Sequence, residues 1–199
     1  MTRTWAVILA GLLALDAASV QAPSSCSVSP PPAVADARPS IYPLSVRLRD
    51  QDGSAAGLDV FRGHPVVVSM FYGSCPAACP LIISRIRDVE AALPAEARAE
   101  LRVLLVSFDP EHDTPEALRA IAGRRQLDLG RWKLVAGADD EVRPLAAALG
   151  ITYHQLPEGG FSHSSVLTVL DRDGRPFARS DDLGADVGPL VRAVKEASR

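Results

Sequence analysis

Cysteine is scarce in this chain, and positive charge is nowhere concentrated. Only 3 of the 199 residues are cysteines, an odd number too small for a disulfide framework. The formal net charge is -3, and no run of Lys or Arg could neutralise a row of phosphates, so we expect no nucleic-acid partner. Internal repeats are also absent. The length and the 47% hydrophobic content therefore predict a single globular domain.

The chain has no apolar run of the roughly 20 residues that span a bilayer. Its longest candidate, Trp5 to Leu15, follows a positively charged start and is interrupted by Asp16. Small residues then continue through Ala22. This pattern predicts an export signal over residues 1–22, either cleaved or retained as an N-terminal anchor.

A segment rich in Pro, Ser and Ala follows over residues 23–43, and it is predicted to be a linker. Cys26 lies in this linker, where the preceding Pro23-Ser24-Ser25 lacks the aliphatic residue of a lipid-modified site. We therefore interpret Cys26 as a tail cysteine. The folded domain is expected over residues 44–199.

Within that domain, hydrophobic periodicity alternates between strand and helix. Strands are expected at 65–71, 101–108, 132–136, 151–154, 164–170 and 176–180, after an opening hairpin around Asp52-Gly53, with helices over 80–93, 115–125, 139–149 and 187–197. Thr114 and Asp139 are the expected helix caps. The order predicts an α/β fold, with a central mixed sheet flanked by helices and a β-hairpin before the C-terminal helix.

Two cysteines stand at a predicted strand-to-helix junction, in the run Cys75-Pro-Ala-Ala-Cys79. Residues four apart share one face of a helix, so both sulfurs can reach one soft cation or each other. The positive end of the helix dipole is expected to favour their thiolates. In an oxidising compartment the pair is open to three uses: a labile redox couple, a metal site kept reduced, or a structural disulfide.

A thiolate pair favours Cu(I), and an added imidazole suits copper in either oxidation state as well as zinc. Of the four histidines, His64 precedes a strand on the side away from the cysteines and His154 is expected at the surface. His112 lies in the acidic loop 109–116 and is a second candidate, whereas the loop around His163 delivers that side chain to the start of a hydrophobic strand. The acidic loop itself is expected to start a helix, with Asp109 and Asp113 as candidates for supporting the ligands or docking a partner.

Three motifs occur in order: Cys75-Pro-Ala-Ala-Cys79-Pro, Ser107-Phe-Asp-Pro-Glu-His-Asp-Thr-Pro115 and Ser162-His163-Ser-Ser. Together they resemble the Sco/SenC family of copper chaperones, from about Leu44 to the C-terminus. The resemblance implies a thioredoxin-like domain that binds one copper, as Cu(I) or Cu(II), through Cys75, Cys79 and His163. It also implies an exported, periplasmic or membrane-tethered protein.

The implied function is the assembly of the CuA centre of cytochrome c oxidase, by delivery of copper to that site or by reduction of its cysteines. The implied partners are the copper-accepting subunit II of that enzyme and a thiol reductant. Many family members carry acidic residues between the cysteines and before the histidine, where this chain has Ala77, Ala78 and Ser162. The field at the site is therefore expected to be less negative here.

The main alternative is an exported thiol-disulfide oxidoreductase with Cys75 as nucleophile and Cys79 as resolving cysteine. Two features separate this chain from thioredoxin-type enzymes: an extra residue between the cysteines, and a histidine where those enzymes present a cis-proline. A peroxide-reducing enzyme would need Thr and Arg around Cys75, and no such constellation is apparent. We expect a metallochaperone rather than an enzyme.

Overall fold

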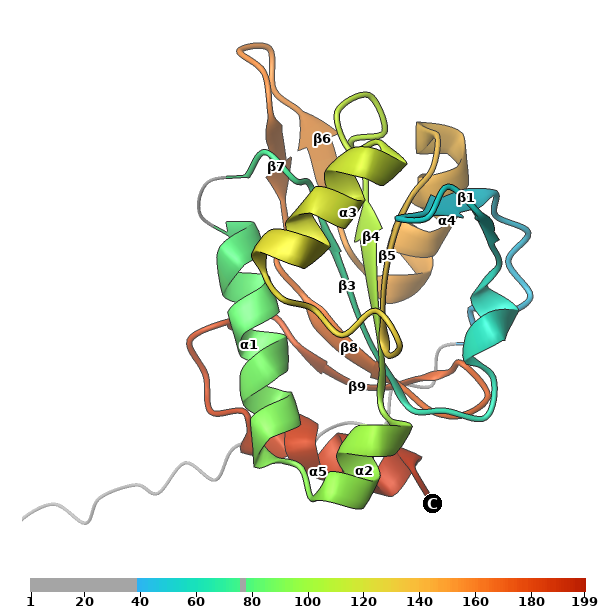
Figure 1. Ribbon diagram of the computed structural model, residues 1–199, viewed down its shortest axis with the longest axis vertical. Helices are drawn as coiled ribbons and strands as arrows, with labels where there is room; N and C mark the ends of the chain where they lie inside the picture. The colour runs from blue at the N-terminus through green and yellow to red at the C-terminus, as the bar shows by residue number, and fades with distance from the viewer. Residues whose placement is uncertain (1–38, 76–77) are drawn as a thin grey trace, which may run out of the picture. The chain divides into compact units, whose positions relative to one another are not determined.

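The computed structural model describes residues 39–75 and 78–199 (Figure 1). The predicted export signal over 1–22, Cys26 and most of the predicted linker lie outside the described residues. Within the described ranges, no helix has both the length and the apolar character required to cross a membrane.

The described chain contains a seven-stranded sheet with the order β2-β1-β5-β4-β3-β8-β9. Its strands are β1 (Leu48–Asp50), β2 (Ala55–Ala56), β3 (Val66–Phe71), β4 (Arg102–Ser107), β5 (Trp132–Ala136), β8 (Leu167–Leu170) and β9 (Pro176–Ser180). β3, β4 and β5 run parallel, while β8 and β9 join antiparallel, so the sheet is mixed as predicted. All six residues of β3 are buried, as expected for a strand covered on both faces.

The helices are α1 (Ala78–Ala92), α2 (Ala95–Glu100), α3 (Pro115–Arg124), α4 (Asp139–Leu149) and α5 (Gly188–Ala197), with the 3-10 turn η1 at Leu58–Phe61. Figure 1 shows α1 and α3 in front of the sheet and α4 behind it. Thr114 caps α3 as predicted, because its hydroxyl accepts a hydrogen bond from the N–H of Ala117 at 3.3 Å. A cap of this kind contributes about 1 kcal/mol.

A separate two-stranded sheet projects beyond the ends of the parallel strands. It pairs β6 (Tyr153–Gln155) with β7 (Phe161–His163) in antiparallel register, with Tyr153 opposite His163. We predicted a strand at 151–154 and a loop around His163, so the second strand of this hairpin was missed.

Three further expectations were wrong in detail. Leu81 was placed on the apolar face of the first helix but is exposed, whereas Ile82 and Ile86 are buried. Asp139 does not cap α4: it is the first helical residue, and Ala138 occupies the cap position without a side-chain hydrogen bond. The short helix α2 was not predicted, because its six residues Ala95–Glu100 include no buried apolar side chain to mark a periodic face.

Candidate metal centre

The cysteine segment begins where β3 ends, at Phe71. The carbonyl of Tyr72 accepts a hydrogen bond from the N–H of Cys75 at 3.2 Å, which closes a tight turn over Gly73. Cys79 is the second residue of α1, so it lies in the first helical turn as predicted. Its thiol donates to the same Tyr72 carbonyl at 3.0 Å and accepts from the Tyr72 N–H at 3.4 Å. Both cysteines are thereby anchored to one backbone unit.

His163 reaches the cysteines from the other side, at the end of β7. Its Nδ1 lies 3.3 Å from the carbonyl oxygen of Ser164. A carbonyl can only accept, so this contact places the proton on Nδ1 and leaves the lone pair of Nε2 for a ligand. The imidazole packs against the rings of Tyr72 and Phe108, with centroid distances of 5.8 and 5.2 Å.

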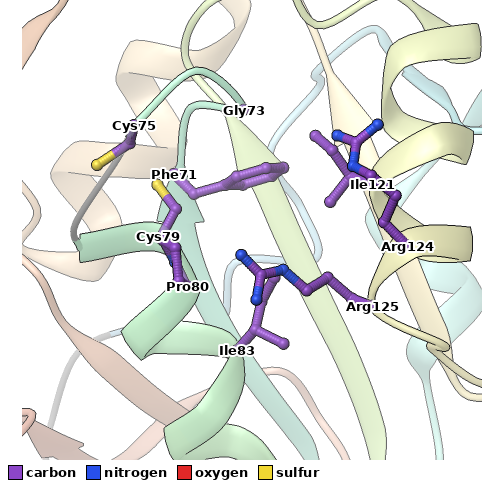
Figure 2. A pocket seen from close by; sticks show the side chains of 9 residues that line it. All are labelled: Phe71, Gly73, Cys75, Cys79, Pro80, Ile83, Ile121, Arg124 and Arg125. Carbon is purple, nitrogen blue, oxygen red and sulfur yellow. The ribbon is translucent and has the colours of Figure 1, made fainter.

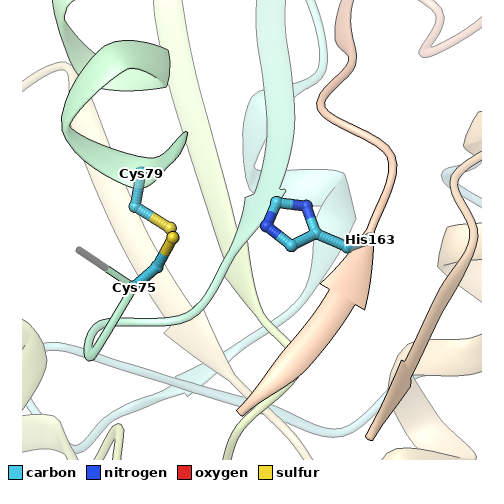
Figure 3. A group of neighbouring side chains, drawn as sticks. All are labelled: Cys75, Cys79 and His163. Carbon is cyan, nitrogen blue, oxygen red and sulfur yellow. The ribbon is translucent and has the colours of Figure 1, made fainter. Parts of the chain in front are cut away.

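The fold brings these three residues together from segments more than eighty residues apart (Figure 3). One potential ligand atom from each of Cys75, Cys79 and His163 lies within 4.8 Å of the others. Two sulfurs and one imidazole nitrogen form a soft donor set that can enclose a single copper or zinc ion. In the described part of the chain, this is the one group of His, Cys, Asp or Glu side chains close enough to hold a metal.

Comparison with known proteins shows the family to which the chain belongs. Residues 40–198 match the sequence profile of SCO1/SenC. The chain belongs to the SCO1/SenC family. This confirms the resemblance drawn from the three motifs.

One of the similar proteins is named for copper binding. A protein of Stutzerimonas stutzeri, described by its name as copper-binding, is 28% identical over 134 residues. The alignment covers 65% of this chain and 64% of that relative, so the chain spans just under two thirds of the relative's length.

Solved structures show the same fold. ScoI of Bradyrhizobium japonicum, solved with copper bound, has a TM-score of 0.63 at 22% identity and covers 76% of this chain and 94% of its own. BsSco, described as a member of the Sco family of cytochrome c oxidase assembly proteins, has a TM-score of 0.66 at 22% identity, with 76% and 90% covered. The predicted thioredoxin-like α/β fold is therefore confirmed.

Burial governs the acidity of Cys79 in this SCO1/SenC chain. The side chain is only 5% exposed, and burial raises the pKa of its thiol well above the usual value. The hydrogen bond with the Tyr72 backbone acts in the opposite direction but is the smaller effect. The expectation that the helix terminus activates both cysteines is thus wrong for Cys79, because desolvation of the thiolate outweighs its position in the first turn.

Asp113 connects the acidic loop to the cysteine segment. Its carboxylate accepts a hydrogen bond from the N–H of Gly73 at 2.8 Å and another from the Ser107 hydroxyl at 2.5 Å. The side chain is buried, and burial raises the pKa of this carboxyl group. Asp113 therefore holds the turn that leads to Cys75.

The other histidines lie elsewhere. His112 is exposed, and its Nδ1 is 2.9 Å from Asp109, whose hydrogen bond raises the pKa of the imidazole. His64 lies 3.4 Å from Glu100, and His154 is exposed on β6. Neither His112 nor His64 belongs to the cluster with the cysteines, so the second candidate ligand, His112, is not part of that group.

A small cavity of about 60 Å³ opens beside the cysteine pair, between α1 and α3 (Figure 2). Both cysteines border it, with Phe71 and Ile83 among the apolar lining residues. The guanidinium groups of Arg124 and Arg125 reach toward it from the end of α3. Both cysteines therefore border a small open space beside the potential ligand atoms.

Sequence reasoning did not identify Tyr72, which contacts both the cysteine segment and His163. Its place directly after a buried strand and three residues before Cys75 is a signal that could have marked it, but such positions are usually filled for packing. The contact with His163 depends on the β6–β7 hairpin, which the sequence pattern did not predict.

Proposed function

We propose that this SCO1/SenC chain binds one copper ion through Cys75, Cys79 and His163 and delivers it to the CuA site of cytochrome c oxidase subunit II. The observation that carries the proposal is that three potential ligand atoms, from two segments far apart in the sequence, lie within 4.8 Å of one another. Two thiolates suit Cu(I), and the imidazole adds the ligand that Cu(II) favours.

The arrangement also suits release of the metal. The three protein ligands leave a copper ion open to entry of a ligand from the acceptor. Cys75 and His163 are each partly exposed, whereas Cys79 is buried. Exchange would therefore begin at Cys75 or His163, while Cys79 holds the ion until the acceptor's sulfur has bound.

The similarity to BsSco supports the choice of acceptor, since that protein is described as belonging to a family of oxidase assembly proteins. The similarity to a copper-bound ScoI and to a copper-binding relative supports the choice of metal. A CuA centre needs copper and reduced cysteines. A copper-loaded dithiol protein can supply the copper, and a metal-free dithiol protein can reduce the cysteines of the acceptor.

A transfer assay tests the function. The soluble protein, loaded with copper, is mixed with the metal-free soluble domain of an oxidase subunit II, and CuA formation is followed by its visible absorption. We expect transfer from the wild type and loss of transfer in Cys75→Ser. His112→Ala is the matched control, because His112 is exposed and paired with Asp109, outside the cluster. Copper retention with no CuA formation at any protein ratio would refute delivery.

One observation favours a second function, that of thiol-disulfide oxidoreductase. The sulfurs of the two cysteines lie within 4.8 Å of each other, and the more exposed Cys75 precedes the buried Cys79, as a nucleophile precedes a resolving cysteine. In that role the Cys75 thiolate attacks a substrate disulfide and releases one substrate thiol. Cys79 then displaces the second thiol and leaves a Cys75–Cys79 disulfide. Turnover that persists in His163→Ala, in a protein that retains no copper, would favour this function over copper delivery.

We also propose that the chain is exported, with residues 44–199 as the copper-binding domain and 23–43 as a linker to an N-terminal signal or anchor. The support is the charge and apolar pattern of residues 1–22. Fractionation of cells that express the tagged full chain tests this. Recovery in the periplasmic or membrane fraction is expected, and recovery in the cytoplasm alone would contradict it.

A further inference from the structure

We propose that Tyr72 is a positioning residue of the copper site: it joins the cysteine segment to the β6–β7 hairpin that carries His163, and its hydroxyl tunes the sulfur of Cys75. This inference rests on the proposed copper site and extends it to a residue that is not itself a ligand. It is supported separately by the backbone, the ring and the hydroxyl of Tyr72.

The backbone of Tyr72 binds both cysteines. Its carbonyl accepts from the Cys75 N–H and from the Cys79 thiol, and its N–H donates to the Cys79 sulfur. Loss of a proton from Cys79 on metal binding would remove the thiol's donation to the carbonyl and leave the N–H donor in place. The position of this backbone unit therefore sets where both sulfurs lie.

The ring of Tyr72 packs against the hairpin. It meets the His163 imidazole edge-on, with an interplanar angle of 88° and centroids 5.8 Å apart, and it contacts Phe161 at 5.3 Å. Phe108 lies on the same ring at 5.6 Å and also contacts His163. The Tyr72 side chain is only 9% exposed. An imidazole packed in this way loses little freedom when a metal binds, which favours the bound state.

The hydroxyl of Tyr72 lies between the two ligand-bearing segments. It forms hydrogen bonds with the side chain of Cys75 and with the backbone of Phe161. The pairing of β6 with β7 leaves the Phe161 N–H available for the bond to the Tyr72 hydroxyl. Across this pairing the N–H of Leu156 donates to the carbonyl of Gly160, and the N–H of Ser164 donates to the carbonyl of Thr152. Because successive N–H groups of an antiparallel strand point alternately toward and away from the partner strand, the N–H of Phe161 points away from β6. A Cβ built on Gly160 would lie 3.5 Å from the same hydroxyl oxygen, which places this oxygen against the hairpin.

The directions of these bonds follow from the chemistry of the groups. The Phe161 N–H can only donate, so the phenol oxygen accepts from it, and the phenol O–H is left to donate to the Cys75 sulfur. A hydrogen bond to a coordinated thiolate withdraws electron density from the sulfur. The thiolate then becomes a weaker donor to Cu(II), so the bond favours Cu(I).

Tyr72→Phe removes this hydroxyl and keeps the ring. Tyr153→Phe is the matched control: Tyr153 is a buried tyrosine in the same aromatic cluster, stacked on Phe108, but its hydroxyl donates to Asp139 at 2.8 Å. In the copper-loaded protein, Tyr72→Phe should raise the ratio of Cu(II) to Cu(I) affinity about tenfold, which lowers the one-electron potential by roughly 59 mV. Tyr153→Phe should leave the potential unchanged.

A measurement without metal separates the failure of this inference from failure of the proposed function. The Cys75–Cys79 pair of the metal-free protein is equilibrated with a glutathione redox buffer. Tyr72→Phe should shift the equilibrium toward the disulfide about threefold, because a reduced sulfur is the better hydrogen-bond acceptor. If the wild type takes up no copper, the copper proposal fails and this equilibrium still decides the role of Tyr72. No shift in Tyr72→Phe, or an equal shift in Tyr153→Phe, would overturn the inference.

Discussion

Substitution of Asp113 tests how the acidic loop supports the cysteine segment. Asp113→Ala removes the acceptor for the Gly73 N–H at 2.8 Å and for the Ser107 hydroxyl at 2.5 Å. Ser107 is fully buried, so its donor is left without water as a replacement. Leaving the buried Ser107 donor unpaired costs about 1–3 kcal/mol, and loss of the part-buried Gly73 hydrogen bond costs about 1 kcal/mol more, so we predict destabilisation by about 3 kcal/mol. Asp113→Asn keeps one acceptor oxygen and should cost about 1 kcal/mol.

The pH dependence of the Asp113→Asn effect follows from the raised pKa of Asp113. Burial is the largest cause, and it raises the pKa above the ordinary value of 3.8. The native state therefore holds this proton more tightly than the unfolded chain does. The contribution of Asp113 to stability is fully present below pH 3.8 and falls as the pH rises through the native pKa. The stability gap between wild type and Asp113→Asn should thus narrow from acid to neutral pH.

Urea unfolding of wild type, Asp113→Ala and Asp113→Asn at pH 4 and pH 7 measures these differences. The copper affinity of each variant is measured in parallel, and it should fall in Asp113→Ala because the turn before Cys75 loses its anchor. The reasoning would be refuted if Asp113→Asn lost more stability relative to wild type at pH 7 than at pH 4. Such a result would mean that the two donors stabilise the carboxylate more than burial destabilises it.

Three further outcomes follow from other contacts in the structure. Gly73→Ala should lower both copper affinity and stability, because a Cβ at this position would overlap the Asp113 carboxylate. Calorimetric titration measures the affinity and urea unfolding measures the stability. An unchanged copper affinity would contradict this prediction. Cu(I) affinity should rise at least about tenfold per pH unit between pH 6 and 8. Burial raises the pKa of the Cys79 thiol, so the metal must displace the thiol proton over this range. A competition assay measures the affinity, and a result with no pH dependence would count against this prediction. Gly174→Ala should destabilise the fold by about 2 kcal/mol without changing copper affinity. The φ of Gly174 is 78°, and a Cβ at this position would lie 2.6 Å from the Tyr42 ring. Thermal unfolding measures the change in stability, and an unchanged stability would show that the turn can relax.

Much of the fold followed from local patterns that tertiary structure reinforces. The buried run before Cys75 became β3, and the Thr114-Pro115 pair starts α3. The turn at Asp171–Gly174 joins β8 and β9, with Gly174 at the positive φ that such turns require. Each of these signals lies within a few residues, so the sequence alone could predict it.

The site depended on contacts that no local pattern reports. The motifs singled out Cys75, Cys79 and His163, but their proximity comes from the β6–β7 hairpin, whose second strand is only three residues long. The acidity of Cys79 was misjudged because the Cys79 side chain is buried, although its neighbour Leu81 in the same helical turn is exposed. Helix position is visible in a sequence, whereas desolvation depends on what packs above it.

Copper titration of the wild type and of His163→Ala, followed by electron paramagnetic resonance, tests the proposed copper site most directly. The wild type should bind one equivalent of Cu(II) with a signal that shows both sulfur and nitrogen ligation. His163→Ala should lose the nitrogen coupling and bind Cu(II) much more weakly, while Cu(I) stays bound to the two cysteines. An unchanged signal and affinity in His163→Ala would contradict the proposed three-ligand site.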